Sequence, residues 1–388
     1  MLGLQWHSSG LTSAGTWFSS HNGIFIMGSL MVLFIGYMVY RGMRGFFRLQ
    51  RWAGLFALGS VVLTIVLMIL GTTGVLHFPA NFNAIAGHGA YAAVARAGSV
   101  PAFGWVPTFY FMVWPAFSIL FSVNMISFSG EVKNFRRGPL IGIVGSMVVT
   151  GVLMIVMMYY GQGAFGTRFL QAAPTSSKVP VPPFLNVFAS ILGNNGFLTI
   201  LISLWVIFVI PFALGSNVIY SSRAMLAWGL DGVAPGPFAN VSERRHTPVF
   251  AIVTLVVLAE VALAIFTYTT WVEILSGFLG FALAFLVVCV TGIIFPFTHR
   301  QTMERSPANI KVAGIPLMTI CGVLAVPFIG FIAYRTATDK ALGANAHISL
   351  IVNGILIVIG FGWFYALRWY RKSRGVDVDR RFKEIPIE

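Results

Sequence analysis

Residues 221–235 read Ser-Ser-Arg-Ala-Met-Leu-Ala-Trp-Gly-Leu-Asp-Gly-Val-Ala-Pro, and a new apolar run begins soon afterwards at Thr247-Pro248. The first part of this stretch predicts an amphipathic end to the helix that begins in the preceding apolar segment. Asp231-Gly232 and Pro235 predict the turn that ends this helix, because glycine adopts turn conformations and proline does not continue a helix. The stretch therefore predicts a short cytosolic hairpin between two membrane helices.

The composition indicates that the whole chain is a membrane protein. Hydrophobic residues make up 57% of the 388 residues and charged residues only 9%, and the mean hydropathy is +0.85. A soluble domain of this composition would have almost no polar surface to expose to water. A net charge of +14 also occurs in proteins that bind nucleic acid, but the basic residues are distributed as membrane topology requires, so no nucleic-acid partner is predicted.

Nine apolar runs are long enough to cross about 30 Å of hydrocarbon, which takes roughly 17 to 25 helical residues. Their approximate cores are 23–40, 52–74, 109–129, 140–160, 197–220, 248–268, 272–297, 315–334 and 348–367. All lysines and arginines lie outside these cores, and 20 of the 25 fall in segments that are cytoplasmic if the N-terminus is outside. Since cytoplasmic loops carry an excess of basic residues, we expect an outside N-terminus and a cytoplasmic C-terminus in the plasma membrane.

Three stretches carry a resemblance to one family. Residues 221–235 with Thr247-Pro248 resemble the loop after the eighth helix of the amino acid-polyamine-organocation (APC) permeases. Residues 130–137 resemble the motif that follows helix six in that family, and residues 295–316 resemble the link between helices ten and eleven in prokaryotic members. The loop residues singled out by these matches are Glu131, Lys133, Asn134, Arg223, Asp231, Gly232, Pro235 and Pro248.

The resemblance implies an all-α integral membrane protein with the leucine-transporter-like inverted-repeat fold. In this register the nine spans are equivalent to helices 4–12, so the resemblance implies that the first three helices are absent. Residues 1–388 are then a single transporter domain. Residues 23–74 end the first repeat, residues 109–297 form the second five-helix repeat, residues 315–367 are two additional helices and residues 368–388 are a basic cytoplasmic tail.

Helix six of this register, at 109–129, corresponds to a broken helix that presents backbone groups to the substrate at the bilayer midplane. We expect the break at Trp114-Pro115 and the residues that follow, up to Ser118 and further on to Ser122 and Asn124. Proline removes an amide donor, and serine and asparagine can bond freed carbonyl groups or an ammonium group. A proline-kinked helix whose serines pack against a neighbour is the alternative. The predicted substrate-binding residues are Phe117, Ser118, Phe121, Ser122 and Asn124, with the two phenylalanines as apolar walls.

Two further places are candidates for coupling to an ion. Ser203, Asn217 and Ser221 share one face of the eighth helix, and the resemblance to sodium-coupled relatives makes Ser216 with Asn217 the candidate cation site. Packing without an ion is the favoured alternative there. Glu260 is the only carboxylate well inside a span, which makes it the candidate for proton coupling. A structural hydrogen bond from Glu260 to a neighbouring helix is its favoured alternative.

The predicted function is secondary active transport of an amino acid or related amine by alternating access, with a proton or sodium ion as the coupling candidates. A transport-inactive truncated paralogue or interaction subunit of a membrane complex is the alternative, which the missing first helix favours. An integral membrane enzyme is disfavoured, because no Gly-rich phosphate loop, HExxH or GxSxG motif occurs. No histidine or cysteine spacing suits a metal, so neither a metal nor a cofactor is predicted.

Overall fold

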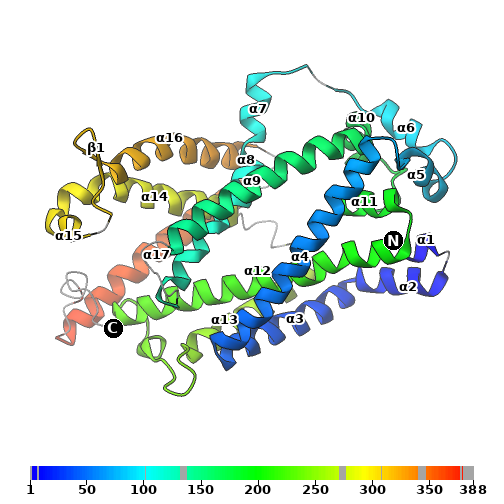
Figure 1. Cartoon of the computed structure of the whole chain (residues 1–388). Helices are drawn as coiled ribbons and strands as arrows, with labels where there is room; N and C mark the ends of the chain where they lie inside the picture. The colour runs from blue at the N-terminus through cyan, green and yellow to red at the C-terminus, as the bar shows by residue number, and fades with distance from the viewer. Residues whose placement is uncertain are drawn as a thin grey trace. The chain divides into compact units, whose positions relative to one another are not determined.

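The computed structural model describes residues 2–6, 8–100, 102–131, 138–270, 277–306, 308–339, 347–375 and 378, and it is built of helices (Figure 1). Within these residues, nine helical segments are long and apolar enough to cross a membrane. They are His21–Arg41, Met43–Thr72, Trp105–Ile126, Gly138–Phe165, Gly196–Leu230, Val249–Tyr268, Gly277–Thr298, Leu317–Thr338 and Ile348–Ser373. The prediction of an all-α integral membrane protein with nine spans is confirmed.

Several of these helices are longer than the hydrocarbon layer. The helix α4 (Met43–Thr72) has 30 residues, which correspond to about 45 Å at 1.5 Å per residue, against about 30 Å of hydrocarbon. Its first ten residues include Arg44, Arg48 and Arg51. The helix α12 (Gly196–Leu230) has 35 residues and carries Arg223 near its end. The excess length therefore places charged residues at the level of the lipid head groups.

The chain forms two units, each with its own internal contacts. Unit 1 comprises Met1–Phe103, Val144–Leu230 and Pro235–Thr267, and unit 2 comprises Gly104–Ile143, Asp231–Ala234 and Tyr268–Glu388. Besides α4 and α12, unit 1 contains α1 (Leu2–Gln5), α2 (Ser9–Phe18), α3 (His21–Arg41), α5 (Phe78–Ala86), α6 (Ala90–Ala97), most of α9 (Gly138–Phe165), α10 (Thr167–Ala172), η2 (Ala173–Thr175), α11 (Leu185–Gly193), η3 (Gly236–Ala239) and nearly all of α13 (Val249–Tyr268). Unit 2 contains α7 (Trp105–Phe111), α8 (Val113–Leu120), η1 (Phe121–Glu131), α14 (Gly277–Thr298), α15 (Arg300–Arg305), β1 (Lys311–Val312), β2 (Ile315–Pro316), α16 (Leu317–Thr338) and α17 (His347–Ser373). The strands β1 and β2 form a short antiparallel pair.

In unit 1, α4 and α12 pack against each other in opposite directions (Figure 1). The rings of Phe56 and Phe208 stack with centroids 4.9 Å apart. Toward the end of α12, Gly215 has no room for a side chain, because a Cβ there would overlap the ring of Phe46. The hydroxyl of Ser60 donates a hydrogen bond of 3.0 Å to the carbonyl of Ile202. Small residues thus let the two helices approach closely, and a hydroxyl supplies the polar contact.

The short helices of unit 1 surround an aromatic core. Phe78 and Phe169 are both fully buried and meet edge to face at 5.2 Å, and the ring of Tyr91 stacks on Phe169 at 5.1 Å. The hydroxyl of Tyr91 donates to the carbonyl of Phe165 at 3.1 Å. This core ties α5, α6 and α10 to the end of α9.

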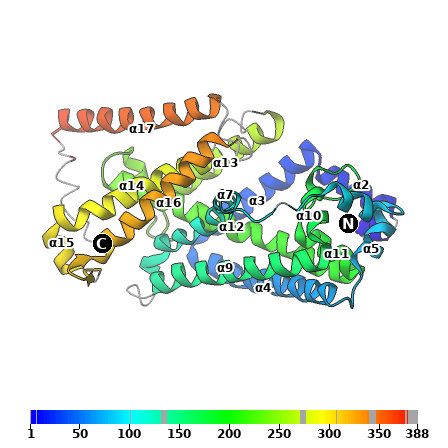
Figure 2. The same ribbon diagram turned by 90° about the horizontal axis from the view of Figure 1, so that it is seen from above.

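In unit 2, α14 and α16 run side by side (Figure 2). Gly322 of α16 faces the carbonyl of Cys289 and the side chain of Ile293 on α14, and a Cβ on this glycine would come within 2.8 Å of that carbonyl oxygen. The α8 helix joins the pair through Val113, which is fully buried against residues of both helices. The α8 helix is therefore anchored on the α14–α16 pair.

Candidate functional site

The segment predicted to contain the broken helix consists of three pieces, α7, α8 and η1. The predicted interruption extends from Trp114-Pro115 to Ser122 and Asn124. In the structure, α8 is regular from Val113 to Leu120, and η1 begins at Phe121 and contains the last two of these residues. Pro115 lies in the first turn of α8 and has no amide hydrogen to donate to the carbonyl of Phe111, where α7 ends. Hydrogen bonds from the amide of Met112 to Thr108 and from Ala116 to Met112 continue across the junction with α7. Besides the turn at Met112 between α7 and α8, the chain departs from α-helical geometry after Leu120.

The departure occurs in η1, a 3-10 helix of 11 residues. A 3-10 run longer than three or four residues is uncommon and marks strain or a hinge inside a helix. Within a membrane, backbone that departs from the α-helix is tolerated where it is buried in protein or lines a polar cavity. Ser122 and Asn124 lie in this run, and Asn124 is 8% exposed.

The predicted substrate residues lie along α8 and η1. Ser118 is exposed and donates a long hydrogen bond of 3.4 Å to the carbonyl of Trp114. Phe121 meets Phe281 of α14 edge to face, with centroids 5.7 Å apart. Ser122 is half-buried. Phe117 lies in α8 with a side chain outside the described part of the structure.

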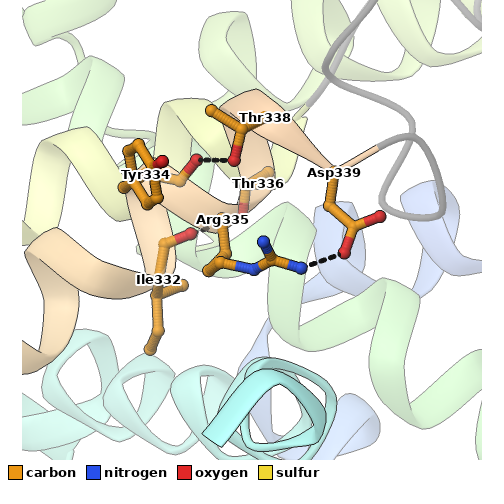
Figure 3. Close-up of polar contacts among 6 residues, drawn as sticks. All are labelled: Ile332, Tyr334, Arg335, Thr336, Thr338 and Asp339. Atoms are coloured by element: carbon orange, nitrogen blue, oxygen red, sulfur yellow. Dashed lines mark hydrogen bonds and ion pairs between the residues drawn. The ribbon is translucent and has the colours of Figure 1, made fainter. Parts of the chain in front are cut away.

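Arg335 lies in the last turn of α16 and is not among the site residues predicted from the sequence. Its guanidinium donates to the carboxylate of Asp339 at 2.5 Å (Figure 3), and its Cζ lies 3.6 Å from the ring centroid of Tyr110 on α7. The Arg335 side chain is only 16% exposed. The positively charged side chain of Arg335 thus links α16 to α7. The signal in the sequence was the spacing of four between an arginine and an aspartate, which suits an ion pair on a helix.

The candidate cation residues lie on α12 in unit 1. The hydroxyl of Ser216 accepts a hydrogen bond of 3.0 Å from the side-chain amide of Gln50 on α4. Asn217 is exposed and donates to the carbonyl of Ala213 in its own helix at 3.1 Å. These two hydrogen bonds join Ser216 to α4 and Asn217 to the backbone of its own helix.

Glu260 of α13 meets α3 in unit 1. The hydroxyl of Ser29 donates a hydrogen bond of 2.6 Å to one carboxylate oxygen of Glu260. The other oxygen, Oε1, is buried and has no hydrogen-bond partner within the described residues. Gly28 and Gly36 of α3 lie directly against Leu263 and Val256 of α13. The carboxylate is therefore held between two closely packed helices, with one acceptor unused.

The loop after α12 has the turn that its sequence predicts. Gly232 has φ 79°, a left-handed conformation that glycine adopts without strain. The carbonyl of Val233 accepts a bond of 3.0 Å from the indole of Trp363, and the carbonyl of Ala234 accepts one of 3.3 Å from Arg371. The residues after Asp231 are therefore fastened to α17 by its side chains.

The rest of this loop returns the chain to α13. Pro235 is followed by η3, whose Ala239 packs so closely on Gly229 that a Cβ there would be 2.5 Å from the Ala239 amide nitrogen. Thr247 and Pro248 are buried immediately before α13 begins. Of the other loop residues, Arg223 lies in α12 and Glu131 ends η1, while Lys133 and Asn134 lie outside the described residues.

Metal ligands do not gather in the described part of the chain, where no three His, Cys, Asp or Glu side chains come together. A family model described as amino acid permease matches residues 8–366. This match includes η1, the loop after α12 and all nine spans except the last turns of the final one. No curated protein and no solved structure matches the chain.

Proposed function

The chain belongs to the amino acid permease family, and from this membership we propose that it is a secondary active transporter that moves an amino acid or a related amine across the plasma membrane by alternating access. Nine apolar spans in one chain suit a polytopic carrier. Transporters of this kind bind substrate where a helix is interrupted at membrane depth and move it by rearranging the helices around that site.

The observation that carries the proposal is the 3-10 run η1, whose residues 121–126 are the last residues of the apolar span Trp105–Ile126. Its carbonyl and amide groups are not aligned as in an α-helix, so polar side chains and a ligand can complete their hydrogen bonds. In this proposal Ser118, Ser122 and Asn124 offer oxygen acceptors for an ammonium group, and Phe121 is an apolar wall. The sequence predicts the same role for Phe117, whose side chain lies outside the described part of the structure. The substrate site proposed here is this segment of unit 2.

Substitution of the two serines tests the proposed substrate site. Ser118→Leu and Ser122→Leu should each weaken substrate binding about 5- to 150-fold, because a bulky apolar side chain replaces a small hydroxyl and leaves a ligand group unpaired, at roughly 1 to 3 kcal/mol. Binding of labelled amino acids to the purified protein, and their saturable uptake into proteoliposomes, would be measured together.

Ser373→Leu is the matched control, since Ser373 is also exposed and also bonds a carbonyl of its own helix. Asn217→Leu distinguishes the proposed substrate site on α8 and η1 from a substrate site on α12. Normal binding by both serine variants, with loss of binding in Asn217→Leu, would move the substrate site to α12. If the unaltered chain shows no saturable uptake and instead copurifies with a membrane complex, the alternative of a transport-inactive interaction subunit is favoured.

A further inference from the structure

Three long helices of unit 1 leave an apolar groove of about 380 Å³ between them. This volume lies at the lower end of the roughly 300–1,000 Å³ of small-molecule sites. Pro211 lies inside α12 and cannot donate to the carbonyl one turn before it, which loosens the helix next to the groove. The groove is lined by Leu30 and Phe34 of α3, Leu49 and Ala53 of α4, and Phe208 and Pro211 of α12, among others.

The groove opens toward the lipid. Leu30 is 58% exposed and Phe34 is 47% exposed, and both lie on a helix that crosses the membrane. An apolar cavity does not hold water stably, because water finds no hydrogen-bond partners in it. A hydrocarbon chain is the occupant that such a surface accepts inside a bilayer.

One end of the groove carries a cluster of positive charge. The α3 helix ends at Arg41, and the first three turns of α4 add Arg44, Arg48 and Arg51. All four arginines are exposed, and residues 21–72 contain no aspartate or glutamate. Within the described residues, no ion pair joins any of these four to an acidic side chain. The cluster is therefore available to an external anion.

The cluster lies in line with the groove. Arg41 follows Phe34 by seven positions, which places both on one face of α3, about 10 Å apart along the axis. On α4, Arg48 lies at the depth of the groove residue Leu49, about 1.5 Å before it along the axis and on the adjoining face of the helix. An acyl chain in the groove would thus bring its own head group to the arginines.

We propose that the groove and its arginine end form a binding site for one anionic phospholipid. The acyl chain lies between α3, α4 and α12, and the phosphate is held by Arg41, Arg44 and Arg48. Arginine suits this role because its planar guanidinium bonds two phosphate oxygens at once. Basic clusters between membrane helices at the head-group level are a recognised arrangement for anionic lipids.

Native mass spectrometry of the purified full chain in mild detergent tests the site, with phosphatidylglycerol and phosphatidylcholine of identical acyl chains as probes. The unaltered chain should retain one phosphatidylglycerol in preference to phosphatidylcholine. Arg44→Gln with Arg48→Gln should weaken phosphatidylglycerol binding about 30-fold, because each basic residue near the surface contributes about 5-fold. Leu30→Trp, which fills the groove from an exposed position, should weaken the binding of both lipids.

Two matched controls make the result specific. Arg305→Gln with Lys311→Gln removes the same charge from exposed positions of unit 2, and Leu55→Trp makes the same substitution at an exposed leucine of α4 that does not line the groove. Equal losses in both double variants would show nonspecific charge attraction and overturn the proposal. Unchanged binding in Leu30→Trp would also overturn it. So would a dimer that forms without added lipid and is lost in Leu30→Trp, since the groove would then hold a second copy of the chain.

Discussion

At the scale of single residues, Glu260 combines a hydrogen bond that suits a structural role with a free acceptor that suits proton binding. Glu260→Gln keeps the shape and an acceptor for Ser29 but removes the titratable proton. If Glu260 couples protons to transport, this variant should lose uptake driven by a pH gradient and keep exchange of substrate across the membrane. Both would be measured in proteoliposomes with labelled amino acid.

The control for Glu260 is Ser29→Ala, which removes the hydrogen bond and keeps the carboxyl group. A structural role predicts that Ser29→Ala and Glu260→Gln change thermal stability, with pH-driven uptake intact in both. Uptake by Glu260→Gln that equals the unaltered chain from about pH 5 to 8 would assign Glu260 to helix packing alone.

Tyr91 gives a prediction about stability at alkaline pH. Burial raises the pKa of the Tyr91 phenol above its ordinary value of 10.0. The folded state therefore holds this proton more tightly than the unfolded state, so the stabilisation is complete below about pH 10 and is lost as the pH rises through the raised value. Tyr91→Phe should show a shallower fall in melting temperature above about pH 10. An equal fall of melting temperature with pH in the unaltered chain and in Tyr91→Phe would contradict a raised pKa of Tyr91. The control is Tyr365→Phe, because Tyr365 is exposed.

At the scale of helices, the closest packing of unit 2 is at Gly322, where α16 meets α14. Gly322→Ala should destabilise the protein by about 1 to 3 kcal/mol, because the new methyl group must displace the backbone around Cys289 or the side chain of Ile293. Gly330→Ala on the same helix meets open space and should be neutral or stabilising by up to about 1 kcal/mol. Thermal unfolding of both variants in detergent gives the comparison, and equal melting temperatures would show that α14 and α16 are not in close contact.

The helices themselves were predictable from the sequence, and their contacts were not. A helix must be apolar over about 20 residues to cross the hydrocarbon layer, so the lengths of the apolar runs were enough to predict the nine spans. The exact position of the interruption could not be predicted from Pro115, because proline interrupts a helix interior but is also tolerated in a first turn, where Pro115 lies. The ring contact between Arg335 and Tyr110 and the bond between Ser29 and Glu260 join residues 225 and 231 positions apart. No local pattern in one sequence encodes such pairs.

At the scale of the whole molecule, the distribution of charge predicts how the chain lies in the membrane. The 25 lysines and arginines divide into 20 on the side of the proposed cytoplasmic loops and five on the other. Short cytoplasmic loops retain basic residues during insertion, and this asymmetry sets the orientation. With the nine candidate spans found in the described residues, we expect the two ends of this chain on opposite sides of the membrane.

Fusions to a reporter that is active only in the cytoplasm measure this orientation in a bacterial host. The reporter should be active after Arg245 and after Glu388, and inactive after Ala93, because an even number of spans separates Arg245 from Glu388 and an odd number separates Ala93 from either. Equal expression of the three fusions, checked by immunoblot, is the control. Activity at Ala93 with none at Arg245 would reverse the orientation. The arginine cluster from Arg41 to Arg51 lies one span before Ala93, so this result would also move the proposed lipid site to the outer leaflet, where anionic head groups are scarcer and the charge of the cluster would have less to bind.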